Sequence, residues 1–243
     1  MSRLLFISDL HLSPRVPELV QRFHALLAEI PPEVDALYIL GDLFDAWIGD
    51  DDPSPFAREI QDALQAFSNK TRLFFQRGNR DFMVGERFAR QTGTVILEDE
   101  QLLECDGQRM LLMHGDQLCT DDLEYQQVRA MVRTPAFREQ ALKKSIGERI
   151  TLANEYRRRS GESLSLKPAD ITDVNQQAVE NALREHDATT LIHGHTHRPA
   201  MHEFELDGRK VRRLVLPDWR ENEPRLGLSW NGATFSWWER TPH

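Results

Sequence analysis

The sequence predicts an α/β (α+β) protein that combines a largely parallel sheet, a helical insertion and a second sheet. In the first half of the chain, short apolar runs alternate with amphipathic stretches, which is the order found in β-α-β units. The segment after Cys119 carries no strand signal, and short apolar runs separated by turns return near the end. Hydrophobic residues make up 40% of the 243 residues and charged residues 28%, as in an ordinary globular protein.

Four apolar runs in the first half are expected to form buried strands, because turn residues bound them and they are too short for helices. These runs are residues 3–8, 36–40, 72–76 and 109–113. Amphipathic stretches at residues 16–30 and 55–67 lie between the first three runs, and Ser54 can cap the second helix in front of Pro55. This order favours a largely parallel sheet.

A helical insertion is expected at residues 121–185, between core segments at residues 1–120 and 186–243. Apolar side chains recur in it at near-helical spacing, with basic side chains on the other face. From Arg129 to Lys167, ten Lys or Arg stand against four Glu and no Asp, although the whole chain has a formal net charge of -9. An anionic partner could therefore meet this segment.

Strand-like patterns resume after the insertion. Residues 190–195 are typical of a strand and a turn, and residues 211–216, 226–230 and 234–238 of antiparallel strands joined by short turns. We expect these runs to build the second sheet.

Composition and charge exclude several classes of protein. No apolar run approaches the roughly 20 residues of a membrane span, and residues 4–7 are too short for a signal-peptide core. The net charge of -9 argues against a general nucleic-acid binder, which needs clustered Lys and Arg. Cys105 and Cys119 have no metal-ligand spacing and suggest no disulfide framework, so we expect a cytoplasmic protein.

Side chains that can bind metal follow five of the predicted strands. They are Asp9 and His11, Asp42, Asn79, His114, and His195 with His197. Period-two alternation would place Asp9 and His11 on the same side of the strand end. Because ligands of open α/β sheets bind at the carboxyl ends of the strands, we expect all these side chains to meet at one edge.

The chemistry of the set indicates a two-metal site. Imidazole, carboxylate and amide ligands suit Mn, Fe or Zn, and thiolates are absent. Asp42 is the candidate for a carboxylate that bridges two ions, because the preceding Gly41 lets the backbone turn tightly. Two cations about 3.5–4 Å apart can lower the pKa of a shared water and clamp a phosphoryl group. Each motif alone is common in turns, so the prediction depends on their coincidence at strand ends.

The motifs D-x-H, GD, GN, H and GHxH occur in this order and resemble those of the calcineurin-like metallophosphoesterase superfamily. The resemblance implies two mixed sheets that face each other and are flanked by helices. It also implies two metal sites that share Asp42. One consists of Asp9, His11, Asp42 and His197, and the other of Asp42, Asn79, His114 and His195.

Arg80 departs from the pattern of many members of that superfamily, in which a histidine follows the asparagine and protonates the leaving group. Arginine stays charged at any ordinary pH and cannot act as that acid. A leaving group that is itself a phosphate monoester, with a second pKa near 6, requires no acid. Arg80 therefore favours cleavage of a pyrophosphate bond, unless it merely pairs with a carboxylate such as Asp81.

Longer segments resemble the family of UDP-2,3-diacylglucosamine hydrolases of lipid A synthesis: FISDLHL, LYILGDLFDAWIGDD, GNRDF, LLMHGDQLCTDD and LIHGHTHRPA. This resemblance implies that water activated at a dinuclear Mn(2+) site attacks the UMP phosphorus. The products would be UMP and 2,3-diacylglucosamine 1-phosphate, or lipid X. It further implies a helical lid over the site, a peripheral position on the cytoplasmic face of the inner membrane, and no obligate protein partner.

The resemblance also assigns roles to individual residues. The expected catalytic residues are Asp42, Asn79, Arg80 and His195. The expected substrate contacts are Asn79, Arg80, Asp122, Tyr125, Ser160, Lys167 and His195. Two other functions stay open at this point: a broader nucleotide phosphodiesterase or dinucleoside polyphosphate hydrolase, and a metal-free scaffold of the same fold.

Overall fold

The computed structural model contains two mixed sheets that face each other. It describes residues 1–166, 172–220 and 223–239, with side chains of the long insertion helix described as far as residue 158. The six-stranded sheet has the order β11 (Phe235–Glu239), β10 (Arg225–Trp230), β1 (Leu4–Ile7), β2 (Ala36–Leu40), β3 (Arg72–Gln76) and β4 (Val95–Ile96). The five-stranded sheet has the order β5 (Glu100–Cys105), β6 (Gln108–Met113), β7 (Thr190–His193), β9 (Arg209–Val215) and β8 (Ala200–Leu206).

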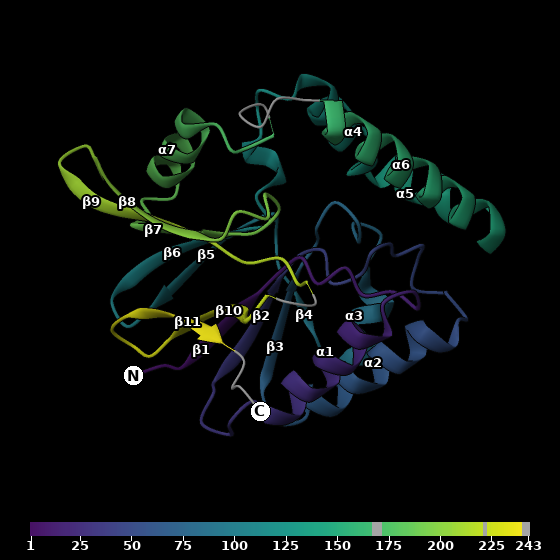
Figure 1. Cartoon of the computed structure of the whole chain (residues 1–243), viewed down its shortest axis with the longest axis horizontal. Coiled ribbons are helices and arrows are strands. Elements are labelled where there is room, and N and C mark those ends of the chain that lie inside the picture. Colours follow the sequence, from purple (N-terminus) through teal and green to yellow (C-terminus); the bar gives the residue numbers. More distant parts are fainter. Residues whose placement is uncertain (167–171, 221–222, 240–243) are drawn as a thin grey trace.

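Alternating side chains of the first sheet explain its two buried faces. Leu5, Ile7 and Ile39 belong to the core that also contains the apolar sides of α1 (Pro17–Glu29), α2 (Pro55–Ser68) and α3 (Glu86–Thr92). Phe6 and Leu40 belong to a separate core shared with the second sheet. The three helices therefore cover one face of the first sheet, and the second sheet covers the other (Figure 1).

The second sheet has its own helix on its far face. α7 (Gln176–Glu185) places Val179 and Leu183 against Leu111 of β6 and Leu191 of β7. This helix lies within residues 121–185, the predicted insertion, whose boundaries stay a prediction. The α/β class and the parallel β1, β2 and β3 are confirmed.

The expected grouping of the last strands is wrong in part. β10 and β11 form an antiparallel hairpin, but the hairpin joins the first sheet next to β1, and β9 pairs parallel with β7 in the second. An apolar run shows that a strand is buried without showing which sheet it completes. The sequence also left β8 unpredicted, because this edge strand exposes His202, Glu203 and Glu205.

The helices α4 (Leu123–Val132), α5 (Pro135–Leu142) and α6 (Ile146–Leu166) follow the short 3-10 helix η1 (Asp116–Leu118) and lie together on one side of the molecule (Figure 1). Side chains of Asp122 and Thr134 cap α4 and α5 by accepting hydrogen bonds from the backbone N–H groups of Tyr125 and Phe137. Over the described ranges, none of the helices combines the length and apolar character needed to cross a bilayer.

Candidate active site

The loops that follow β1, β2, β3, β6 and β7 bring together the seven predicted metal ligands. Five of the seven have a left-handed backbone with φ between 49° and 66°: Asp9, His11, Asp42, His195 and His197. Non-glycine residues rarely adopt this conformation, which costs about 1–3 kcal/mol each and concentrates at functional sites. The strained backbone conformation therefore orients these five side chains toward the site.

The expected reason for the convergence of Asp9 and His11 was wrong. β1 ends at Ile7, and both residues lie in a left-handed loop instead of continuing the strand. Their backbone N–H groups donate to the carbonyl oxygens of Gly41 and Asp42, at 3.1 and 3.0 Å. Pairing between the two loops, and not strand alternation, directs both side chains into the site.

The first group of ligands centres on Asp9. Its Oδ1 atom lies 3.3 Å from Nε2 of His197 and 3.9 Å from Nε2 of His11, and these two nitrogens are 3.2 Å apart. The Nδ1 atom of His11 lies 3.8 Å from Oδ2 of Asp42. Asp42 therefore adjoins this group through one of its carboxylate oxygens.

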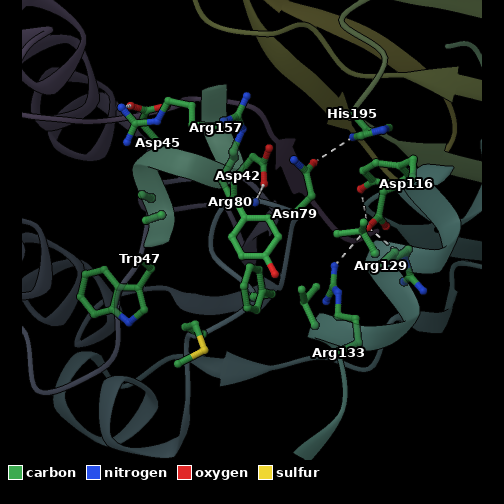
Figure 2. A pocket seen from close by; sticks show the side chains of 18 of the residues that line it. Asp42, Asp45, Trp47, Asn79, Arg80, Asp116, Arg129, Arg133, Arg157 and His195 are labelled. Atoms are coloured by element: carbon green, nitrogen blue, oxygen red, sulfur yellow. Dashed lines mark hydrogen bonds and ion pairs between the residues drawn. The ribbon is translucent and has the colours of Figure 1, made fainter. Parts of the chain in front are cut away.

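The second group centres on the Oδ1 atom of Asn79, which lies 2.9 Å from Nδ1 of His195 (Figure 2). The same oxygen lies 3.0 Å from Nε2 of His114. The other oxygen of Asp42, Oδ1, lies 3.7 Å from Nε2 of His114. Nδ1 of His114 donates to the carbonyl oxygen of Leu40 at 2.8 Å, which leaves its Nε2 lone pair directed into the site.

The arrangement fits bound divalent cations. Oδ1 of Asp9 is buried and has no hydrogen-bond partner among the described residues, although Oδ2 accepts from Ser8 and from the backbone of His195. Around it, nitrogen and oxygen atoms face one another at distances where lone pairs repel unless a proton or a cation lies between them. Grouped by ligand atoms within 4.8 Å of one another, Asp9, His11 and His197 form one set, and Asp9, Asp42 and His114 another.

The electrostatics of the site indicate the same need for positive charge. Burial, with the negative charge of Asp9, raises the pKa of Asp42 to about 6 against the opposing charge of His114. Burial would also raise the pKa of Asp9, but the positive charge of a protonated His197, whose Nε2 lies 3.3 Å from Oδ1, holds it below its ordinary value. Burial lowers the pKa of His195 to about 3, so this imidazole is neutral and one of its ring nitrogens has a lone pair for a cation.

Asp81 supports the site from behind. Its fully buried carboxylate accepts hydrogen bonds from the backbone N–H groups of Gly78 at 2.7 Å, Leu43 at 2.8 Å and Phe44 at 3.4 Å. These bonds tie the loop that carries Asp42 to the loop that carries Asn79. Asp81 is thus occupied by backbone groups and does not serve as a partner for the Arg80 side chain.

Replacement of Asp81 by alanine is expected to lower the free energy of unfolding by about 3 kcal/mol, because buried N–H groups would lose their acceptor. Denaturant unfolding of the metal-free protein measures the change. Asp62→Ala, at an exposed position on α2, removes the same kind of side chain and should change stability by less than about 0.5 kcal/mol. Equal stability of the two variants would contradict this role for Asp81.

A cavity of about 310 Å³ extends from the ligand cluster to α4, α5 and α6 (Figure 2). Its polar end is lined by Asp42, Asn79, Arg80 and His195. Its other end is lined by apolar side chains of the loops and of α4, α5 and α6: Trp47, Phe82, Val128, Val132, Phe137 and Leu152. The cavity is therefore suited to a molecule with an anionic end and an apolar end.

Of the expected substrate contacts, Asn79, Arg80, Asp122, Tyr125 and His195 all line this cavity. The Tyr125 ring lies over that of His195, with centroids 5.6 Å apart. Lys167 and the side chain of Ser160 lie outside the described residues. These two assignments stay predictions.

The sequence did not single out a charged network that holds α4 to the strand ends. The buried carboxylate of Asp116 accepts from Nε of Arg129 at 2.9 Å and from Arg133 at 3.3 Å, and the hydroxyl of Tyr125 donates to it at 3.2 Å (Figure 2). Asp99 pairs with the same two arginines, at 2.8 and 3.2 Å. The sequence did contain a signal for this network, because Asp116 lies two residues after the ligand His114. A buried acid at such a position requires a positively charged partner.

Comparisons with known proteins agree with the geometry. The family model for calcineurin-like phosphoesterases matches residues 2–199. The UDP-2,3-diacylglucosamine hydrolase of Stenotrophomonas maltophilia is 47% identical over 239 residues, covering 95% of this chain and 96% of its own. The enzyme of that name from Aromatoleum aromaticum is 48% identical, covering 94% and 93%, and the one from Escherichia coli is 47% identical, covering 88% and 90%. The chain therefore belongs to the calcineurin-like phosphoesterase family, among the UDP-2,3-diacylglucosamine hydrolases.

Proposed function

We propose that the protein hydrolyses the pyrophosphate bond of UDP-2,3-diacylglucosamine and releases UMP and 2,3-diacylglucosamine 1-phosphate. The observation that carries the proposal is the continuous cavity in which the ligand cluster and Arg80 meet an apolar wall. This wall, formed largely by the insertion helices, would receive the acyl chains. The insertion at residues 121–185 would then act as a lid.

The metal centre of this proposal consists of two Mn(2+) ions per chain. Asp9, His11, Asp42 and His197 would hold one ion, and Asp42, Asn79, His114 and His195 the other. When bound, such ions lower the pKa of a water molecule and neutralise a phosphoryl group. Asp42 would be the shared ligand, because its two oxygens are directed toward His11 and His114.

Arg80 and His195 would contact the diphosphate. Within the described ranges, the Arg80 guanidinium forms no hydrogen bond or ion pair, although it lines the cavity. A guanidinium whose N–H groups make no hydrogen bond at this position is suited to a phosphate oxygen. The oxygen of water would form a bond to the UMP phosphorus and release its protons to solvent, and the bond from that phosphorus to the bridging oxygen would break. The leaving sugar phosphate keeps the electron pair, and no protein acid is required.

The outer surface of the insertion supports a position on the cytoplasmic face of the inner membrane. Four exposed large apolar side chains of α4, α5 and α6 lie outside the cavity lining: Leu123, Met131, Leu142 and Ile150. Lys143 and Lys144, which lie between α5 and α6, and Arg158 of α6 are exposed as well. Exposed apolar and basic side chains in the same segment favour an anionic bilayer, where each basic residue contributes about 1 kcal/mol.

Vesicle flotation tests this position. We expect the protein to float with phosphatidylglycerol vesicles at low salt and to bind phosphatidylcholine vesicles less, since the lysines require anionic headgroups. Leu123→Ser combined with Ile150→Ser should weaken flotation. Absence of binding to both kinds of vesicle would contradict a peripheral membrane position.

The reaction is tested with Mn-loaded protein in water enriched in oxygen-18. We expect release of UMP from UDP-2,3-diacylglucosamine, with the label in UMP and none in the sugar phosphate. Faster hydrolysis of a dinucleoside polyphosphate than of the acylated substrate would favour the broader phosphodiesterase. Label in the sugar phosphate would contradict attack on the UMP phosphorus.

A further inference from the structure

Asp218 lies behind one of the proposed metal ligands. Its Oδ2 atom is 3.5 Å from Nδ1 of His197. The opposite ring nitrogen of that histidine, Nε2, faces Asp9 and His11. Asp218 is 8% exposed, belongs to the segment between β9 and β10, and is not among the seven ligands.

Backbone contacts fix this segment to both sheets. The N–H of Leu216 donates to the carbonyl oxygen of His193 at 2.7 Å, at the end of β7. The N–H of Trp219 donates to the carbonyl oxygen of Asp9 at 3.0 Å, just after β1. Asp218 therefore lies between two hydrogen bonds that connect it to the loops carrying His197 and Asp9.

Side-chain contacts hold the same segment in place. The buried Trp219 indole donates to the carbonyl oxygen of Leu226 at 3.0 Å, and the Arg22 guanidinium lies 4.9 Å from the ring centroid. The Arg220 guanidinium pairs with Oδ2 of Asp218 from the solvent side. The carboxylate is thus held from outside while it faces His197 on the inside.

An imidazole can bind a cation through a nitrogen only if that nitrogen carries no proton. A hydrogen bond from the other ring nitrogen selects the required tautomer and fixes the ring. His114 shows this arrangement, with its Nδ1 donating to Leu40 and its Nε2 directed inward. We propose that Asp218 is a positioning residue that accepts the Nδ1 proton of His197 and so aims its Nε2 lone pair at the metal site.

This inference rests on the proposed metal centre, and metal binding tests it without turnover. Titration of stripped protein with Mn(2+), with free ion detected by electron paramagnetic resonance, gives two dissociation constants for the wild type. Asp218→Ala should weaken one of them about 10–100-fold and leave the other within about twofold. Asp218→Asn should retain most of the affinity, because its amide oxygen can still accept the Nδ1 proton.

Glu223→Gln is the matched control. It removes one negative charge from the same segment, where Glu223 pairs with Arg225, and it should leave both dissociation constants unchanged. An equal loss in Glu223→Gln, or unchanged affinities in Asp218→Ala, would overturn the role of Asp218 while leaving the metal centre intact. A wild-type protein that takes up no Mn(2+) would overturn both.

A spectroscopic measurement on the wild type requires no variant to fold. In protein loaded with diamagnetic Zn(2+), nitrogen-15 chemical shifts should show that the proton of His197 resides on Nδ1. A proton on Nε2 in the loaded protein would overturn the inference.

Discussion

Asp42→Ala is expected to abolish turnover, with a loss of kcat greater than about 10³-fold. The two oxygens of Asp42 lie 3.8 Å from a nitrogen of His11 and 3.7 Å from one of His114, so this side chain adjoins both ligand groups. Removal of the Asp42 side chain would weaken the binding of both ions, whereas loss of a peripheral ligand would weaken the binding of only one ion. Steady-state UMP release together with metal analysis measures both consequences.

Asp45→Asn is a suitable comparison for this variant. Asp45 lines the same cavity and pairs with Arg157 at 2.9 Å, but it lies outside both groups of ligand atoms. We expect this variant to keep its full metal content. Near-normal kcat in Asp42→Ala would show that the two ligand groups do not share this carboxylate.

For Arg80→Ala, the expected result is a loss of about 10²–10³-fold in kcat/KM with both metals retained. The backbone N–H of Arg80 donates to Oδ1 of Asp42 at 2.8 Å, and this bond survives any change of side chain except proline. The guanidinium lies in the cavity and is available for a phosphate oxygen. In this variant, kcat/KM should therefore fall while the metal content stays unchanged.

Arg80→Lys provides the matched control, because it keeps the charge and loses the planar fork that binds phosphate through two N–H groups. We expect its activity to lie between those of the wild type and Arg80→Ala. Loss of metal in Arg80→Ala would mean that this side chain supports the metal centre and does not act on the substrate.

Local patterns in the sequence were sufficient to predict the strands that carry ligands. β2 and β3 coincide with the predicted runs, because these runs are buried and bounded by turn residues. The sheet joined by β10 could not be predicted in this way. Its alternating Leu226, Leu228 and Trp230 would suit either sheet, and only packing against β1 decides between them.

The predicted metal ligands lie close together as expected, but the residues that support them could be identified only from the structure. Asp9 and His11 were identifiable by type and spacing, while the left-handed loop that aims them has no signature in a period-two pattern. Asp116 and Asp218 look like ordinary loop acids in the sequence. Their roles depend on arginines and histidines far along the chain, which only folding brings within contact.

In the proposed reaction, two cations held at the strand ends make the protein a pyrophosphate hydrolase. Metal-stripped protein is titrated with Mn(2+) while bound metal and UMP release from UDP-2,3-diacylglucosamine are followed together. We predict no release before addition and full release as uptake reaches two ions per chain. Full release by stripped protein, or no uptake of Mn(2+), would contradict the account.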